Sequence, residues 1–255
     1  MFSLRSFARS CAVLLLGKEV KPRTILRGLA SGYRICVSPA KHLGYLVGTY
    51  EPQLQRAIKT YVRRDDTVWD IGANIGYVAL CCAKQVGPSG RVIAFEPVPE
   101  NAALLRRNVA ENKLANIQVL EVAASESCGE AVIRIPENLA TASLVWHRRN
   151  ASATELVIKT VVVDELVASG DIPRPQFVKI DVEGAEGQVL LGMRRTVAAV
   201  KPVLFVECSD AGREATWHLL HEIGYQCRSA TTGEAVDDFE SYRHSDFIWL
   251  PPQQS

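Results

Sequence analysis

The sequence predicts an α/β protein in which a mainly parallel β-sheet is covered by helices on both faces. Short apolar runs alternate along the chain with helical stretches of about 10–15 residues, which is the pattern of successive β-α units. The chain has 255 residues, of which 47% are hydrophobic and 22% are charged. A chain of this length and composition can bury a core without disulfides or metals, so one large domain is expected.

The first half of the predicted sheet consists of apolar runs that end in turn-forming residues. A helix over 52–62, with Pro52 in its first turn, precedes a short strand over 67–71. Glycines follow that strand and lead into an apolar helix over 77–86, which "GPSG" ends before a compact strand over 91–95. A helix over 97–113, with two prolines near its start, then leads to a third strand over 116–124.

The pattern changes to a period of two between residues 125 and 164. The runs "EAVIRIP" and "ELVIKTVVV" indicate antiparallel strands around a loop, so this segment is an insertion of strands and loop. The β-α alternation then resumes with strands over 176–181 and 201–208, each followed by a helix. The runs "YQCRSA" and "DFIWLP" predict two closing strands. We therefore assign residues 43–255 to one domain with an inserted segment at about 125–164.

Residues 1–42 form a basic N-terminal extension that we expect to be helical. Residues 1–41 carry eight lysines and arginines against the single acid Glu19, whereas the rest of the chain has 21 basic and 27 acidic residues. The apolar run "CAVLLLG" is short for a signal peptide, and no cleavage pattern follows it. An amphipathic helix packed on the body, on a partner or on a membrane surface fits better. Such an extension could also mediate homo-oligomers.

Composition argues against several classes of partner. The net charge of +1 gives no overall basic field for nucleic acid. No run approaches the roughly 18 apolar residues of a transmembrane segment. The seven cysteines are odd in number and lack C-x-x-C spacing, which predicts reduced thiols in a cytoplasmic protein.

Distinctive polar or glycine-rich stretches follow four of the predicted strands. They are 70–76, Glu96, 181–184 and Glu207. In a parallel sheet, ligands bind beyond the carboxyl ends of the strands, near the point where the strand order reverses. We therefore expect these four stretches to converge on one site.

The stretch "DIGANIG" (70–76) has the character of a ligand-binding turn. Its glycines permit positive φ and a close approach of backbone to ligand, and the helix that follows points free N–H groups at the same place. A dinucleotide-binding turn would have a middle glycine that makes room for pyrophosphate, but Asn74 occupies that position. The pattern D-x-G-x-N-x-G therefore favours a ligand with an amino group and no phosphate. A plain strand-to-helix turn is the alternative.

Glu96 ends the second strand of the predicted sheet, 20 residues after Gly76. An acid at this position typically accepts hydrogen bonds from ribose hydroxyls and would repel a 2′-phosphate. The alternative is an acid that only stabilises the N-terminus of the next helix.

Four motifs, taken in order, resemble the FkbM-type family of S-adenosylmethionine-dependent methyltransferases. They are "DIGANIGYVAL", "VIAFEPVPENAALLRRNV", "VKIDVEGAEGQVLLGM" and "KPVLFVEC", and the similarity covers about residues 43–250. The resemblance implies a class I methyltransferase (Rossmann-like) fold, with a seven-stranded, mostly parallel sheet and an antiparallel hairpin at one end. It also implies that residues 43–255 are a catalytic domain of the EC 2.1.1 type.

The same resemblance implies a set of residues that bind S-adenosylmethionine. The glycine-rich turn would line the methionine side, Glu96 would hold the ribose, and the end of the third strand would lie near adenine. Asp181 would stand where the transferred methyl group meets the acceptor. The implied cofactor-binding residues are Asp70, Gly72, Ala73, Asn74, Gly76, Tyr77, Glu96, Pro97, Ala123, Ala124, Ser125 and Asp181.

A hydroxyl acceptor would need a nearby base to take its proton. The candidates are Asp181, Glu183 and Glu207, together with His147 from the inserted loop; we assign catalysis to Asp181, Glu207 and His147. Asp181 and Glu207 end strands that should be neighbours, so they could also hold a hard divalent ion. Capping of the following helix is the alternative for Asp181 and Glu183, and we expect no metal.

These observations predict S-adenosylmethionine-dependent O-methylation of a hydroxyl on a small-molecule or glycan-type acceptor. One alternative is N- or carboxyl-methylation of a macromolecule, for which only the basic extension argues. A nicotinamide-dependent reductase is disfavoured by Asn74 in place of the middle glycine. A non-catalytic cofactor-binding scaffold is the third alternative.

Overall fold

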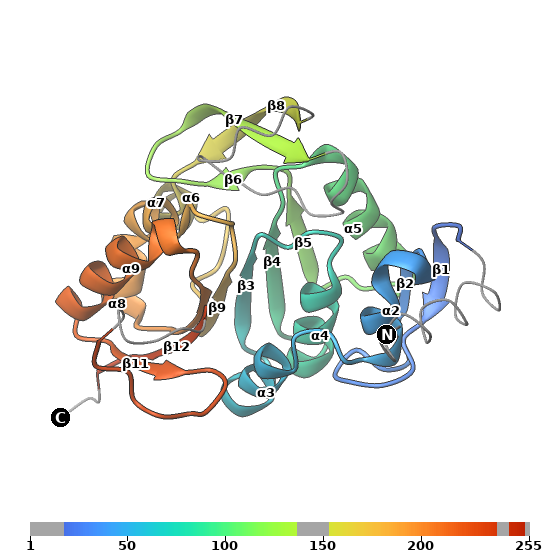
Figure 1. The fold of residues 1–255 in the computed structure, drawn as a ribbon, viewed down its shortest axis with the longest axis horizontal. Coiled ribbons are helices and arrows are strands. Elements are labelled where there is room, and N and C mark those ends of the chain that lie inside the picture. Colours follow the sequence, from blue (N-terminus) through green and yellow to red (C-terminus); the bar gives the residue numbers. More distant parts are fainter. Residues whose placement is uncertain (1–17, 137–152, 239–244, 253–255) are drawn as a thin grey trace, which may run out of the picture.

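A computed structural model describes residues 18–136, 153–238 and 245–252 of the chain. Its centre is a seven-stranded sheet with strand order β11-β12-β10-β9-β3-β4-β5 (Figure 1). The five strands β10, β9, β3, β4 and β5 are parallel, and β12 runs antiparallel to both β10 and β11. This confirms the predicted fold class. The strands are β3 (Thr67–Ile71), β4 (Arg91–Phe95), β5 (Ile117–Leu120), β9 (Phe177–Ile180), β10 (Val203–Glu207), β11 (Gln226–Ser229) and β12 (Asp246–Leu250).

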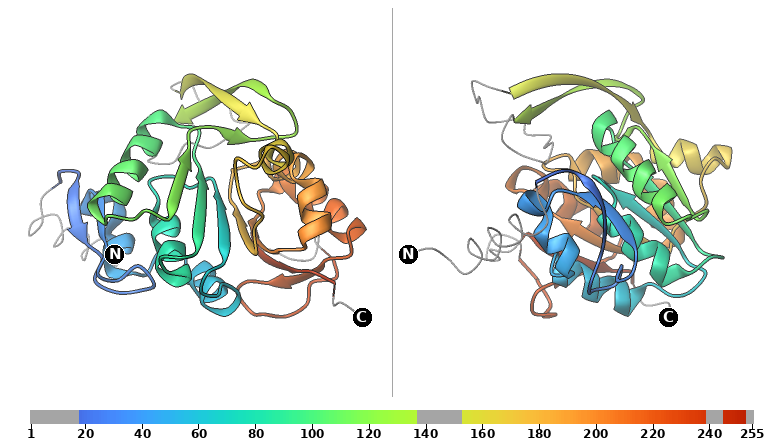
Figure 2. Two further views of the ribbon diagram at one scale, coloured as in Figure 1. Left: turned by 180° about the vertical axis from the view of Figure 1, so that it is seen from behind. Right: turned by 90° about the vertical axis from the view of Figure 1, so that its right-hand side faces the viewer.

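Helices cover both faces of this sheet (Figure 2). Because successive side chains of a strand point to opposite faces, β3 sends Val68 into one hydrophobic core and Trp69 into the other. The first core is closed by α2 (Pro39–Val47), α3 (Pro52–Tyr61), α4 (Tyr77–Val86) and α5 (Pro99–Glu111). The second is closed by α6 (Val163–Ser169), α7 (Glu186–Gly192), α8 (Arg194–Val200) and α9 (Asp210–Glu222).

The N-terminal extension departs from the predicted helix. Residues 21–37 contain a two-stranded antiparallel sheet, formed by β1 (Lys21–Thr24) and β2 (Arg34–Val37), and helix α2 begins only at Pro39. Two asparagines explain this, Asn108 of α5 and Asn112 at its C-cap: the Asn108 side chain accepts a hydrogen bond from Cys36 N at 2.6 Å, and that of Asn112 accepts one from Arg34 N at 2.7 Å. The free edge of β2 is thus hydrogen-bonded to α5. Residues 1–17 lie outside the described ranges.

The inserted segment contains a second, three-stranded sheet with order β6-β8-β7. Strands β7 and β8 pair antiparallel, which is the arrangement predicted from the period of two. The alternation is visible in burial, because Ile133 and Ile158 are buried while Val132 and Val157 are exposed. Residues 137–152 between the two strands, including His147, lie outside the described residues. The strands are β6 (Ala123–Ala124), β7 (Gly129–Pro136) and β8 (Ala153–Val161).

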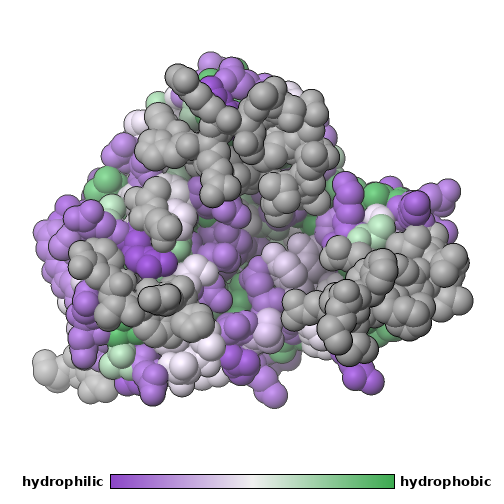
Figure 3. All heavy atoms as spheres, in the orientation of Figure 1, coloured by the Kyte–Doolittle hydropathy of each residue, from purple (hydrophilic) through white to green (hydrophobic). Residues whose placement is uncertain are grey.

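One face of the molecule shows how polar residues and the site entrance are arranged. The face drawn in Figure 3 is mostly hydrophilic and is hollowed near its middle. Among the helices that the structure describes, none has both the length and the apolar character needed to cross a membrane. The cysteines in the described ranges are free thiols, and all of them except Cys128 are buried.

Candidate active site

A cavity of about 320 Å³ opens at the carboxyl ends of the parallel strands. The chain proceeds from β3 through β4 to β5 on one side, and then returns to place β9 and β10 on the other side. Strands β3 and β9 are therefore neighbours at the point where the strand order reverses, which is where this class of sheet binds ligands. Wall residues come from the loops after β3, β4, β5, β9 and β10, together with residues 45–51.

The loop after β3 explains the D-x-G-x-N-x-G pattern. The third, fifth and seventh residues of this pattern all have positive φ: 81° at Gly72, 50° at Asn74 and 89° at Gly76. Glycine adopts this conformation freely, and asparagine is among the few other residues that tolerate it. At Gly72 a side chain is also excluded by contact, because a Cβ atom there would lie 1.9 Å from the Asp181 carbonyl oxygen.

Most of the predicted cofactor residues lie on the cavity wall, but three do not. Gly76 contacts helix α5, where a Cβ atom would lie 2.8 Å from Leu105 Cγ, so its role is packing. Ser125 is directed away, and its backbone N–H pairs with Val161. Asp70 is fully buried beneath the wall. The predicted residues on the wall are Gly72, Ala73, Asn74, Tyr77, Glu96, Pro97, Ala123, Ala124, Asp181 and Glu207.

Glu96 is held in place by three donors. Its Oε2 accepts from Asn74 N at 2.7 Å, and its Oε1 accepts from Val98 N at 3.0 Å and from Asn101 Nδ2 at 3.3 Å. Burial raises the pKa of this carboxyl group, and these hydrogen bonds oppose that effect. Each carboxylate oxygen can accept about two hydrogen bonds, so Oε2 keeps capacity for a ligand hydroxyl. We call Gly72, Ala73, Asn74 and Glu96 the glycine half of the cavity.

An apolar patch of the cavity wall lies beside Glu96. It comes from the end of β4, from the loop after it, and from β6 and β7 of the inserted segment. Such a surface suits the flat face of an adenine ring, and the acid next to it suits a ribose. The glycine half therefore fits the adenosine part of S-adenosylmethionine. The apolar residues are Phe95, Val98, Val122, Ala123, Ala124 and Ile133.

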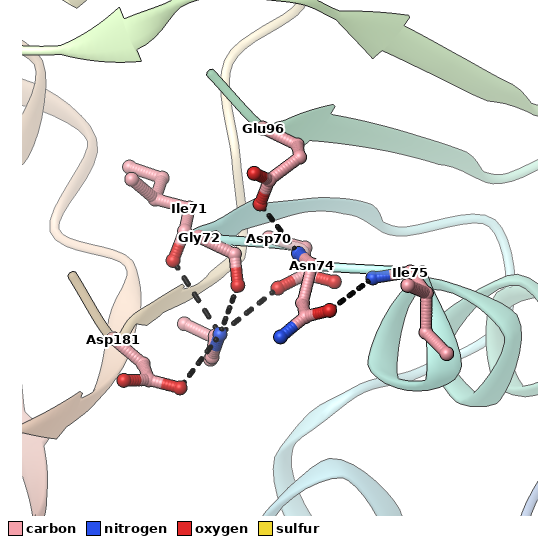
Figure 4. A network of polar contacts seen from close by, with 8 residues as sticks. Asp70, Ile71, Gly72, Asn74, Ile75, Glu96 and Asp181 are labelled. Atoms are coloured by element: carbon pink, nitrogen blue, oxygen red, sulfur yellow. Dashed lines mark hydrogen bonds and ion pairs between the residues drawn. The ribbon is translucent and has the colours of Figure 1, made fainter. Parts of the chain in front are cut away.

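Lys179 is a residue of the cavity wall that was not predicted from the sequence. It lies on β9 beside Asp70 of β3, and its side chain is 3% exposed. Its Nζ lies 3.5 Å from Asp70 Oδ1 and 3.3 Å from Asp181 Oδ2, and it donates to the Gly72 carbonyl at 2.7 Å. Figure 4 shows Asp70, Gly72 and Asp181 around this network. Burial lowers the pKa of the Lys179 ammonium group, but the surrounding carboxylates raise it by more. The net pKa is raised, so the lysine is charged. A lysine inside the apolar strand "FVKI" was the available signal.

The other side of the cavity carries carboxyl groups from three separate segments. Glu51, Asp181 and Glu207 each place one carboxylate oxygen within 4.8 Å of the others. Burial, with repulsion from Asp181, Asp246 and Glu51, raises the pKa of Glu207 to about 8. Burial also raises the pKa of Glu51 to about 7. We call Glu51, Asp181 and Glu207 the carboxyl half. Glu51 was not predicted, since it lies in a loop before Pro52 with no motif around it.

Glu183 and Glu186, which both follow β9, lie in different surroundings. Glu183 lines the cavity, and burial raises its pKa. Glu186 is fully buried and structural: its carboxylate accepts from Gly184 N at 2.8 Å and from Ser209 Oγ at 3.3 Å. Glu186 thereby ties the loop after β9 to the start of α9.

The carboxyl half could also admit a divalent cation, because carboxylate oxygens are the ligands that such ions prefer. The sequence suggested only Asp181 and Glu207 for that role, and the structure adds Glu51 to them. Carboxyl groups gather in this way in many proteins without an ion, so the spacing alone assigns none.

Comparison with known proteins gives relatives that are methyltransferases. The chain is 33% identical over 154 residues to the hexuronic acid methyltransferase AglP of Haloferax volcanii, covering 60% of this chain and 61% of that protein. It is 31% identical over 153 residues to the methyltransferase sdnD of Sordaria araneosa, covering 49% of this chain and 59% of that protein. The chain thus spans about three fifths of the length of these curated relatives.

A solved structure and a family match agree with these relatives. The FkbM methyltransferase of Methylobacillus flagellatus KT shares the fold, with a TM-score of 0.51 and 21% identity, covering 78% of this chain and 48% of that one. The methyltransferase FkbM domain matches residues 70–231. That range runs from the glycine-rich loop past Glu96 and Asp181 to the end of β11, well over half of the chain. On this match, the protein belongs to the FkbM methyltransferase family.

Proposed function

We propose that this protein is an S-adenosylmethionine-dependent methyltransferase that acts on a hydroxyl group of a small-molecule or glycan-type acceptor. The observation that carries the proposal is that Asp181 and Glu207 line the same cavity as Gly72 and Glu96. A donor bound over the glycine half would therefore lie next to groups that can accept a proton. The relative AglP is a hexuronic acid methyltransferase, which supports a sugar-type acceptor.

The chain's own residues would do the work of binding and orientation. When bound, S-adenosylmethionine supplies an activated methyl group on a positively charged sulfur. Glu96 would accept hydrogen bonds from the ribose hydroxyls, and the apolar patch around Ala123 would exclude water from the adenine. Holding an acceptor oxygen at about 3–3.5 Å from the methyl carbon supplies much of the rate enhancement in such reactions.

The acceptor proton would pass to the carboxyl half. A base works best when its pKa is near the working pH, and the pKa of Glu207 is raised to about 8. Asp181 lies between Glu207 and the glycine half, because β9 separates β10 from β3. We assign proton removal to Asp181 or Glu207. His147, the third sequence candidate, lies outside the described residues and stays a prediction.

Charge favours a hydroxyl acceptor over a carboxylate. Among the described residues that line the cavity, the one cationic side chain is Lys179, and it already pairs with Asp181. An acceptor carboxylate would meet the repulsion of several like charges. A hydroxyl avoids that repulsion and can donate its hydrogen bond to them. The carboxyl groups on the wall are Glu51, Glu96, Asp181, Glu183, Glu207 and Asp246.

We also propose a reducing, cytoplasmic location. The free thiols Cys81 and Cys82 of α4 support it, because adjacent buried cysteines of a protein in an oxidising compartment are prone to mispairing. Mass-spectrometric mapping of thiols in the protein from its native cells tests this, and disulfides among the described cysteines would contradict it.

Calorimetry with S-adenosylmethionine and with NAD tests the donor class. We expect binding of S-adenosylmethionine alone; binding of NAD alone would overturn the proposal in favour of a reductase. Acceptors are then sought by mass spectrometry of metabolite extracts, as compounds that gain the mass of one CH₂ group. If no compound gains it while the donor binds, the scaffold alternative is supported.

Asp181→Ala tests the catalytic assignment. We expect turnover to fall by roughly 10²–10⁴-fold, the usual contribution of proton transfer, while donor binding changes little. Asp171→Ala is the matched control, because Asp171 is exposed and its carboxylate accepts a hydrogen bond from Ser169 Oγ in its own turn. Full activity of the Asp181 variant would remove this residue from the mechanism.

A further inference from the structure

Glu51 reaches the cavity from a position that ordinarily serves another purpose. It is the N-cap residue of helix α3, where the side-chain oxygen of a Ser, Thr, Asp or Asn commonly accepts a hydrogen bond from a free N–H group of the helix. Its side chain makes no such hydrogen bond. Its backbone is left-handed, with φ 43° and ψ 64°, and the side chain lies on the cavity wall instead. The local structure thus directs this carboxyl group to the site.

The position of Glu51 along the sheet edge is next to the donor. Its carboxylate lies within 4.8 Å of those of Asp181 and Glu207. Asp181 follows β9, which is the strand adjacent to β3 and its glycine loop. Neighbouring strands are about 4.8 Å apart, so Asp181 is roughly one strand spacing from the glycine loop after β3. Glu96 follows β4, which lies on the other side of β3. A donor whose ribose meets Glu96 would place its sulfur near the carboxyl half.

Aromatic rings complete this part of the wall. Tyr45, Tyr50 and Tyr77 all line the cavity. The rings of Tyr45 and Tyr77 stack with centroids 4.8 Å apart, and Tyr50 meets Tyr45 edge-on at 4.4 Å. The Tyr50 hydroxyl also hydrogen-bonds the Glu51 carboxyl group. Aromatic rings beside carboxylates are an environment that attracts an organic cation, through ring quadrupole and charge.

One nearby ammonium group offsets only part of the charge of these acids. Lys179 is shared between Asp70 and Asp181 and donates to the Gly72 carbonyl. Among the described wall residues it is the one cation. The carboxyl half therefore carries an excess of negative charge once Glu51 and Glu207, whose pKa values are raised to about 7 and about 8, are ionised.

We propose that Glu51 is a specificity-determining residue that, together with Asp181 and Glu207, attracts the positive charge on sulfur and makes the protein prefer S-adenosylmethionine to S-adenosylhomocysteine. The inference rests on the proposed function. The two molecules differ by the methyl group and its sulfonium charge, and both keep the same adenosine, amino and carboxyl groups. After transfer the sulfur is neutral, so this attraction disappears and the product is released more easily.

Calorimetric titration of both molecules into the full-length protein and into Glu51→Gln tests the proposal. Glutamine keeps the size of the side chain and an oxygen for the Tyr50 hydroxyl, but it removes the charge. We expect the variant to bind S-adenosylmethionine on the order of tenfold more weakly, and S-adenosylhomocysteine within about twofold of the original affinity. Glu51→Asp, which keeps the charge, should recover part of the preference.

Glu19→Gln is the matched control, because Glu19 is an exposed glutamate of the N-terminal segment, paired only at 3.8 Å with Lys21. It should change neither affinity. An equal loss for both molecules in Glu51→Gln, or no loss for either, would overturn the proposal. So would loss of S-adenosylmethionine affinity on adding EDTA to the original protein, since a metal ion would then occupy the carboxyl half. If neither molecule binds the original protein, the proposed function itself fails.

Discussion

The glycine half and the carboxyl half of the cavity are built on opposite principles. In the glycine half, Glu96 is held by three N–H donors and the backbone follows a fixed course of positive φ angles. In the carboxyl half, Glu51, Asp181 and Glu207 crowd together, and the pKa values of Glu51 and Glu207 are raised. Under the proposed function, the first half would receive the uncharged ribose and adenine with little rearrangement. The carboxyl half is stabilised most when it binds a cation or a proton, because either one relieves the repulsion between its carboxylates.

Lys179 joins the two halves, so replacing it should have the largest effect. In Lys179→Met the Asp70 carboxyl group would stay buried without its ammonium partner, and the Gly72 carbonyl would lose a donor. We expect the free energy of unfolding to fall by roughly 3–5 kcal/mol, the usual cost of breaking a buried ion pair from one side. Urea denaturation measures it.

Lys21→Met is the control for this comparison, because Lys21 forms an exposed ion pair at 3.8 Å with Glu19. Its loss should cost less than about 1 kcal/mol. Equal and small effects for both lysines would show that Lys179 does not hold the two halves together.

Gly72→Ala should have the next largest effect and isolates the contact between the halves. Gly72 and Gly170 have the same φ of 81°, but a Cβ atom at Gly170 meets nothing within 4 Å. Gly170→Ala should therefore show only the backbone cost, about 1–2 kcal/mol. At Gly72 the Asp181 carbonyl must also move, so we expect a loss of roughly 3–4 kcal/mol in the free energy of unfolding. Thermal melting of the two variants side by side checks the difference, and equal losses would contradict the close contact.

The smallest expected change is that of the free energy of unfolding with pH. It should arise from the carboxyl groups of the carboxyl half. The pKa of Glu51 is raised to about 7 and that of Glu207 to about 8, so the folded protein binds more protons than the unfolded chain between the ordinary pKa of 4.5 and these values. Stability from these groups is complete below the ordinary pKa and is lost as pH rises to about 8. We expect the loss to be roughly 1–3 kcal/mol.

Glu207→Gln should reduce this loss, whereas Glu100→Gln, at an exposed site in the first turn of α5, should not. Urea denaturation at about pH 5 and about pH 8 gives the two values for each protein. A stability that rises between these pH values would contradict the picture of crowded carboxyl groups.

The fold and the glycine half could be predicted because their signals are local. A strand is visible as a short apolar run, and positive φ at residues 72, 74 and 76 requires the residue types that the motif displays. The surroundings of Asp70 could not be predicted for a physical reason: its place in the motif is visible, but its partner Lys179 lies 109 positions away and meets it only through strand register. The motif therefore could not show that Asp70 lies beneath the wall.

The carboxyl half was only partly predictable, because its residues are far apart in the sequence and the order of the strands brings them together. The sequence placed Asp181 and Glu207 at neighbouring strand ends, and the strand order confirms that placement. Glu51 was beyond reach, because nothing local distinguishes a glutamate that caps a helix from one that turns away from it. The N-terminal hairpin was missed similarly, since its hydrogen-bond partners Asn108 and Asn112 lie on a distant helix.

The backbone contact between Gly72 and the Asp181 carbonyl limits how this enzyme family member can be re-engineered. There is no room for even one carbon atom between Gly72 and the Asp181 carbonyl, so the backbone after β9 fixes which residue can stand at position 72. A designer who grafts a new acceptor loop after β9 would need to preserve the path of the chain at residues 181–182. Under the proposed function, Glu183, whose side chain lines the cavity, is the position in this loop where the acceptor preference could be changed while this backbone contact is kept.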